Sequence, residues 1–160
     1  MVTKRKAKAT SPKKAYNDTQ KNIPFEDLVN NIKDFCEYKF SVVDYNVDEE
    51  LISLARTEGI DLNGYKHIVE NDAARHSYIG HELSVDDYLL IPYIIRNREQ
   101  VRISDKLTGT RKQKAFIYRK TIGDEYVYVE EIRNGKNKSL AFQTLYKRKI
   151  KTPPKKGGVK

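Results

Sequence analysis

The feature that most restricts the fold of this chain is a change of texture near residue 97. Beyond it, four segments rich in β-branched and aromatic residues alternate roughly between apolar and polar positions. Turn signals at Gly109, Gly123 and the Asn134-Gly135 pair separate them. The segments are QVRISD, QKAFIYRKTI, EYVYVEEIRN and LAFQTLYKRK. This order predicts a four-stranded antiparallel meander, in which each strand pairs with the next.

Before residue 97, the apolar residues recur at helical spacing. The segment 24–39 predicts a helix, followed by SVVDYN as a short strand or as the end of that helix. A second helix is expected after the N-cap residue Asp48, a third over roughly 65–76, and a short one between the cap Ser84 and Pro92. Helices first and strands second predict an α+β fold, with an N-terminal helical block packed on a C-terminal antiparallel sheet of about four strands.

Charge is distributed unevenly along the chain, whose net charge is +9. Residues 1–22 carry +6 and residues 147–160 carry +7, whereas 23–95 carries −10 and 96–146 carries +6. The ends, rich in Lys, Ser, Thr, Pro and Gly, cannot bury enough apolar surface to fold, so we expect disordered basic arms over 1–22 and over the last residues from 150. Such arms hold a polyanion by counterion release, or serve only as solubilising linkers.

Several classes of protein are disfavoured. No apolar run is long enough to span a membrane, and the charged start does not resemble a secretory signal. The single cysteine, Cys36, cannot form an internal disulfide, and no Cys/His cluster has zinc spacing. The sequence therefore predicts a cytoplasmic chain without a metal or other cofactor, although the Asp86-Asp87 pair keeps a divalent cation open.

Four segments follow one another in an order typical of one nuclease group. After a histidine-bearing helix they are Val85–Pro92, Tyr118–Lys120, Tyr126–Arg133 and Thr144–Lys147. This series resembles the phage members of the Barnase–EndoU–colicin–RelE superfamily of nucleases. The resemblance implies a nuclease domain over 62–149, preceded by a helical extension over 23–61.

The resemblance also implies an activity. It suggests a metal-independent endoribonuclease, a toxin or phage-delivered effector, that acts in the bacterial cytoplasm on RNA such as tRNA or mRNA. The 2′-hydroxyl of the substrate attacks phosphorus and leaves a 2′,3′-cyclic phosphate. An immunity or antitoxin protein is a further expected partner. Two alternatives stay open: a non-catalytic RNA- or DNA-binding module, and a protein-interaction or inhibitor domain that uses the acidic half.

Such a reaction needs groups for proton transfer, cations for the developing charge, and hydroxyls that orient the phosphate. His67 or His76 is the candidate for proton transfer. Arg75 and Lys120 are the candidate cations, and Thr144 and Tyr146 are the candidate hydroxyls. Alternation places Lys120 on one strand face with Tyr118, and Thr144 on one face with Tyr146. If these two faces coincide, Lys120, Thr144 and Tyr146 line one cleft with the helix histidine.

Contacts to nucleic acid are expected from the basic half, because single-stranded RNA is gripped by aromatic rings beside phosphate-binding cations. The chain has eleven tyrosines and no tryptophan. The candidates are Tyr118, Arg111, Lys112, Lys114, Arg133 and Lys147. A solvated loop and ordinary sheet packing explain the same residues, so both interpretations remain open at this point.

Overall fold

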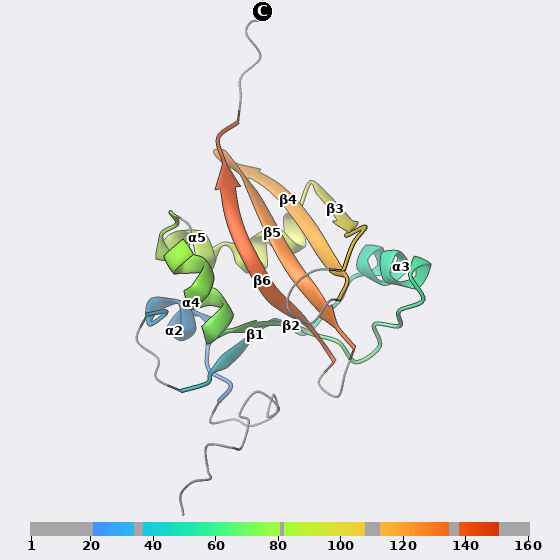
Figure 1. Cartoon of the computed structure of the whole chain (residues 1–160), viewed down its shortest axis with the longest axis horizontal. Helices are drawn as coiled ribbons and strands as arrows, with labels where there is room; N and C mark the ends of the chain where they lie inside the picture. The colour runs from blue at the N-terminus through green and yellow to red at the C-terminus, as the bar shows by residue number, and fades with distance from the viewer. Residues whose placement is uncertain (1–20, 34–36, 81, 108–112, 135–137, 151–160) are drawn as a thin grey trace, which may run out of the picture.

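The computed structural model describes residues 21–33, 37–80, 82–107, 113–134 and 138–150. Its centre is a six-stranded mixed sheet in the order β1-β2-β6-β5-β4-β3 (Figure 1). The strands are β1 (Phe40–Asp44), β2 (His67–Glu70), β3 (Gln100–Ile103), β4 (Ala115–Ile122), β5 (Asp124–Arg133) and β6 (Ser139–Arg148). The helices are α2 (Phe25–Asn30), α3 (Glu49–Thr57), α4 (Asn71–Gly80), α5 (Val85–Leu89) and α6 (Ile91–Asn97). No helix in the described ranges is long and apolar enough to cross a membrane.

Strands β3 to β6 form the antiparallel meander that the alternating pattern predicts. The turn between β4 and β5 is a single residue, Gly123, whose φ of 76° lies in the left-handed region that glycine adopts without a steric penalty. The expected turns at Gly109 and Gly135 lie outside the described residues.

The sheet contains two strands more than expected, and the helix predicted over 65–76 is wrong in its first half. Residues His67–Glu70 form β2, and helix α4 begins only at Asn71. β2 is antiparallel to β1 and parallel to β6, so both of its edges are paired and all four of its residues are buried. A strand buried on both faces shows no apolar–polar alternation, which is why its pattern resembles a turn of helix.

The predicted N-terminal helical block is also wrong, because helices and strands intermix. Among the described residues of the helix expected over 24–39, which leave out 34–36, the helix covers Phe25–Asn30, and a strand begins at Phe40. Cys36 lies outside the described residues. Two predicted helix starts are confirmed: Asp48 accepts a hydrogen bond from the Leu51 amide (3.1 Å), and Ser84 forms a capping box at the start of α5. Pro92 stands at the beginning of α6.

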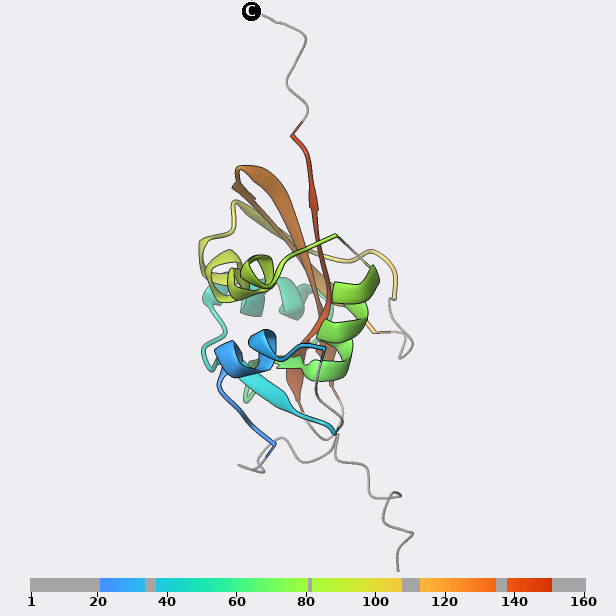
Figure 2. The same cartoon turned by 90° about the vertical axis from the view of Figure 1, so that its left-hand side faces the viewer.

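The sheet has two unlike faces. On one, which we call the helix face, α2, α5 and α6 lie together (Figure 2), and they enclose the main hydrophobic core. Fully buried rings such as Tyr88 and Phe142 belong to this core, and burying each contributes roughly 1.5–3 kcal/mol. On the other, which we call the open face, the views show no described helix over β3, β4 and β5. Helix α4 runs beside β6, along the edge that the short β2 leaves unpaired.

Candidate functional site

The pairing register assigns the residues of β4, β5 and β6 to the two faces. On the open face, three successive rows across these strands are Thr121–Glu125–Arg148, Arg119–Val127–Tyr146 and Ile117–Val129–Thr144. The pairing of β5 with β6 is shifted at Val129, so one extra residue of β6, Gln143, precedes Thr144. The rows bring two guanidinium groups, one carboxylate and three hydroxyls to neighbouring positions on a surface that the described helices leave uncovered.

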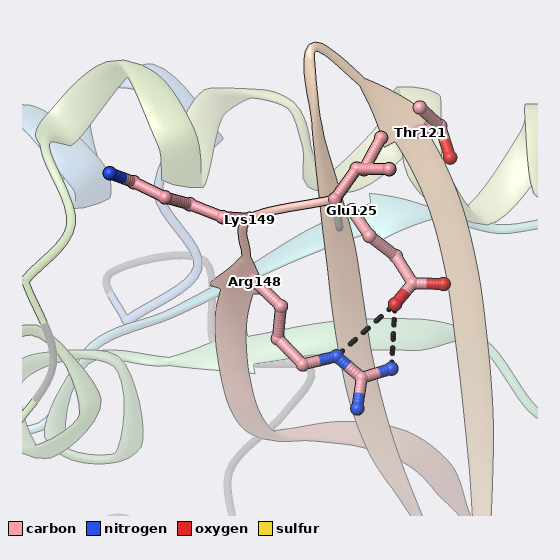
Figure 3. A pocket seen from close by; sticks show the side chains of 5 residues that line it. Thr121, Glu125, Arg148 and Lys149 are labelled. Carbon is pink, nitrogen blue, oxygen red and sulfur yellow. Dashed lines mark hydrogen bonds and ion pairs between the residues drawn. The ribbon is translucent and has the colours of Figure 1, made fainter. Parts of the chain in front are cut away.

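The charged groups of these rows are in direct contact. Arg148 donates from Nε (3.1 Å) and from Nη2 (2.6 Å) to Oε1 of Glu125 (Figure 3). Arg119 reaches the same oxygen from the neighbouring strand, with its Nη1 at 3.4 Å. The three side chains are between 28% and 48% exposed, so solvent reaches all of them. We call Arg119, Glu125 and Arg148 the open-face cluster.

A shallow depression of about 470 Å³ lies beside the cluster, lined by Thr121, Glu125, Arg148, Lys149 and Ile150 (Figure 3). The hydrogen bond from Arg148 lowers the pKa of Glu125, and together with the charges of both arginines it outweighs the opposing effect of burial. Glu125 is therefore ionised at neutral pH.

This arrangement suits a phosphate group better than a cation. Two guanidinium groups face one carboxylate, which leaves a net positive charge, and guanidinium groups bind phosphate through paired hydrogen bonds. The ion pairs are exposed, and such pairs contribute only about 0–1 kcal/mol, so an incoming phosphate can displace the carboxylate at little cost. Within the ranges that the structure describes, no group of three His, Cys, Asp or Glu side chains could hold a metal ion.

A second polar cluster lies on the helix face and is enclosed. With its proton on Nδ1, His67 of β2 donates to Oε2 of Glu130 on β5 (2.6 Å), and the hydroxyl of Tyr118 on β4 donates to Oε1 (2.6 Å). The hydroxyl of Tyr128 is also buried and makes no hydrogen bond of good geometry with a described residue. Because His67, Tyr118 and Glu130 are all 0% exposed, we call them the buried cluster.

Burial and charge act in opposite directions on His67. Burial disfavours the imidazolium, but the charge of Glu130 and its hydrogen bond outweigh that effect and raise the pKa of His67. Burial, with the carboxylate of Glu130 as a second cause, raises the pKa of Tyr118 well above its ordinary value. The Nε2 atom of His67 has no hydrogen-bond partner in the described part of the chain. The buried cluster thus joins three strands through one carboxylate.

A comparison with protein-family models matches residues 45–153 to the family described as phage-Barnase-EndoU-ColicinE5/D-RelE like nuclease3. The chain belongs to this nuclease family. The match includes all of the open-face cluster and every strand but β1. No curated protein and no solved structure matched the chain. The family shows a nuclease with an α+β fold; it does not name the nucleic acid that is cut.

The nuclease does not carry His67 where the sequence pattern places it. Only the second half of the helix expected over 65–76 forms: His67 lies in β2, and α4 begins at Asn71. Being 0% exposed, His67 cannot touch a substrate bound at the surface of this structure.

Arg75 and His76 do lie on a helix, α4, as expected. They line a second shallow depression, of about 540 Å³, together with Lys33, Asp72 and Ile79. Arg75 pairs with Asp72 at 3.7 Å. Neither residue belongs to the rows of the open face, so a catalytic role for either remains a prediction that the geometry does not support.

The expectation that Lys120, Thr144 and Tyr146 line one cleft is wrong. Lys120 pairs with Tyr126, which pairs with Lys147, and this row lies on the helix face. Thr144 and Tyr146 lie on the open face. Tyr146 is in the row next to Glu125 and Arg148, and Thr144 is one row further along β6. The two strand faces do not coincide, because strand pairing alternates side chains between the faces of the sheet.

The residues expected to contact nucleic acid do not form one surface either. Tyr118 is enclosed in the core, so its ring is not available to stack on a base. Lys114 donates to the carbonyl groups of Ser104 and Asp105, both at 3.0 Å, and Lys147 pairs with Asp87 at 3.3 Å. Arg111 and Lys112 lie outside the described residues.

Arg133 lies on the open face but is already paired on both sides. Its Nη1 lies 2.8 Å from Glu70 and its Nε lies 3.0 Å from Glu131, and only 14% of its side chain is exposed. Tyr38 donates to the other oxygen of Glu70 at 2.8 Å. Arg133 is therefore less accessible to a phosphate than the two arginines of the open-face cluster.

Sequence reasoning did not select Arg119, Glu125 or Arg148. Arg148 was counted with the basic tail, and Glu125 follows a turn signal, where an acidic residue is ordinary. The signal that could have found them is alternation: Arg119 falls on the strand face opposite Lys120, and Tyr146 and Arg148 are two residues apart. Only the register shows that these positions meet.

Proposed function

We propose that this nuclease is an endoribonuclease that cuts RNA on the open face of its sheet, without a metal ion. The observation that carries the proposal is the open-face cluster: two guanidinium groups reached by solvent that share one ionised carboxylate, with the hydroxyl-bearing residue Tyr146 in the adjoining row. A metal-free mechanism is favoured because the arginines would repel a cation from the only carboxylate between them.

The phosphodiester at the cut binds between Arg119 and Arg148 and takes the place of Glu125 on both. Released from its ion pairs, Glu125 becomes a stronger base, and it accepts the proton of the substrate's 2′-hydroxyl. The 2′-oxygen then bonds to phosphorus, and the bond from phosphorus to the 5′-oxygen breaks. The arginines neutralise the charge that develops on the phosphorane.

The leaving 5′-oxygen takes a proton from the hydroxyl of Tyr146 or from water, and the product is a 2′,3′-cyclic phosphate. Tyr146, in the row next to Glu125 and Arg148, orients the phosphate. Atoms and charge balance without any further reactant. The same site on DNA would lack the attacking hydroxyl, so DNA should bind without being cut.

The test is incubation of the full chain with total RNA, tRNA and DNA of matched length in excess EDTA, beside Glu125→Gln. Exposed Glu49 on α3 supplies the matched control, Glu49→Gln. We expect RNA fragments ending in cyclic phosphate from the wild type and the control, with a loss of about 10²- to 10⁴-fold in Glu125→Gln. Loss of cleavage in EDTA, or equal rates in all variants, contradicts the proposal. Gel shifts without cleavage indicate a binding module instead.

We further propose a role as a toxin or phage-delivered effector that an immunity or antitoxin protein restrains; membership of a phage nuclease family supports this role. Induced expression in bacteria tests it. The wild type should arrest growth while Glu125→Gln, made in equal amount, should not.

A further inference from the structure

β3 is the edge strand of the sheet next to β4, and two of its side chains lie on the open face. Gln100 pairs with Arg119, and Arg102 pairs with Ile117, so both share the face of the open-face cluster. The alternate residues confirm this assignment, because Val101 and Ile103 pack against the core of the helix face. Gln100 and Arg102 themselves are exposed.

Arg102 continues the line of positive charge that begins at the cluster. It lies diagonally opposite Arg119, an arrangement that puts two residues of neighbouring strands roughly 7–8 Å apart. Three arginines thus lie on one face of neighbouring parts of the sheet: Arg148 on β6, Arg119 on β4 and Arg102 on β3. The outer strands of this line are separated by three strand spacings, or roughly 14 Å.

Arg102 also differs from the neighbouring arginines in its contacts. Among the described residues no carboxylate forms an ion pair with it, whereas Arg119 and Arg148 share Glu125. Arg98, which follows α6, is held by Asp48 and Glu50 and is only 7% exposed. Within the described part of the chain the charge of Arg102 therefore has no ion-pair partner, and Arg102 lies on the edge strand next to the site.

We propose that Gln100 and Arg102 form a second phosphate-binding subsite, which holds the nucleotides next to the cut and directs the RNA strand across β6, β5, β4 and β3. The inference rests on the proposed function, because it takes the open-face cluster as the place of cleavage. Arg102 binds a backbone phosphate that does not react, and Gln100 offers an amide to the adjoining sugar or base. The subsite therefore affects how tightly long substrates bind and leaves the chemical step unchanged.

The experiment compares a short and a long substrate. One is a dinucleotide with a single scissile phosphate; the other is an oligodeoxynucleotide with one internal ribonucleotide, so that it too has one cut. kcat/KM is measured for the wild type, Arg102→Ala and Gln100→Ala, with Arg56→Ala as the matched control because Arg56 is exposed on α3. Melting curves confirm that every variant is folded.

We expect the wild type to prefer the long substrate. Arg102→Ala should lose about three- to fivefold in kcat/KM on the long substrate, the effect of one exposed charge contact, and nothing on the dinucleotide. On the long substrate, kcat/KM decreases as salt is added. A plot of log kcat/KM against log salt should be shallower by about 0.7 for Arg102→Ala than for the wild type. Equal losses on both substrates, or no loss on either, overturn the subsite.

The failure of the proposed function has a different signature. If the wild type cuts neither substrate, the affinity for all-deoxy oligonucleotides of the two lengths is measured instead. If Arg102→Ala binds the longer oligonucleotide more weakly than the wild type does, and binds the shorter one equally well, the subsite is still supported. If the variant and the wild type bind both oligonucleotides equally well, the subsite is overturned.

Discussion

Two of the carboxylates on strand β5, Glu125 and Glu130, have different surroundings because they lie on opposite faces. Glu130 is 0% exposed and accepts hydrogen bonds from His67 and Tyr118. Glu125 is 30% exposed and accepts hydrogen bonds from Arg119 and Arg148. Each carboxylate accepts hydrogen bonds from two side chains that lie on two other strands. Of the two, Glu125 alone is exposed and can contact a substrate.

The difference shows that exposure, rather than residue type, decides which polar cluster can react. A carboxylate enclosed in the core cannot exchange its partners without leaving a charge unpaired, which costs several kcal/mol. A carboxylate at the surface exchanges partners at little cost. The buried cluster therefore joins the strands, and the open-face cluster remains available for binding and chemistry.

The largest effect is expected where the buried cluster is broken. Glu130→Ala leaves His67 and Tyr118 without their acceptor, so the free energy of unfolding should fall by about 3–5 kcal/mol. Urea denaturation measures this change. Glu125→Ala is the matched variant on the same strand, and it should lower the free energy of unfolding by less than about 1 kcal/mol. Similar losses for the two would remove the distinction between the faces.

The next effect concerns activity. Arg148→Lys keeps the charge but loses the paired hydrogen bonds, and Arg148→Ala loses both. We expect RNA cleavage to fall by about 10²- to 10³-fold in Arg148→Ala and by less in Arg148→Lys, with unchanged melting temperatures. Arg56→Ala serves as the control. An Arg148→Ala protein with full activity would show that the reaction takes place elsewhere.

A smaller change sharpens the description of the buried cluster. Tyr118→Phe removes one hydroxyl from Glu130 and keeps the ring, so stability should fall by about 1–3 kcal/mol. Cleavage by the folded fraction should not change, because the ring lies on the helix face. A selective loss of activity with full stability would instead assign Tyr118 to the reaction.

The smallest effect is a pH dependence. The pKa of His67 is raised above its ordinary value of 6.5 in the folded protein, so its contribution to stability is complete below pH 6.5 and is lost as pH rises through the folded value. One such group changes the free energy of unfolding by at most about 1.4 kcal/mol per pH unit. Denaturation of the wild type and His67→Gln across this range measures the difference. Parallel curves would show that His67 does not titrate.

The sequence by itself determined the meander of β3 to β6, because alternating strands and turn residues are local signals. The caps at Asp48 and Ser84 were equally local, since a side chain and an amide three residues away form them. The nuclease family was also visible in the order of segments from Val85 to Lys147, and the family match bears it out.

Only the tertiary structure decided where β2 goes and which strand faces meet. β2 is a strand because β1 and β6 pair with its two edges, and these partners lie far from it in sequence. The same pairing encloses His67, the residue that a sequence search for an acid or base selects first. Register likewise separates Lys120 from Tyr146 and brings Arg119 to Glu125. Local patterns do not report register, because it is fixed by the burial of one whole face against the helices.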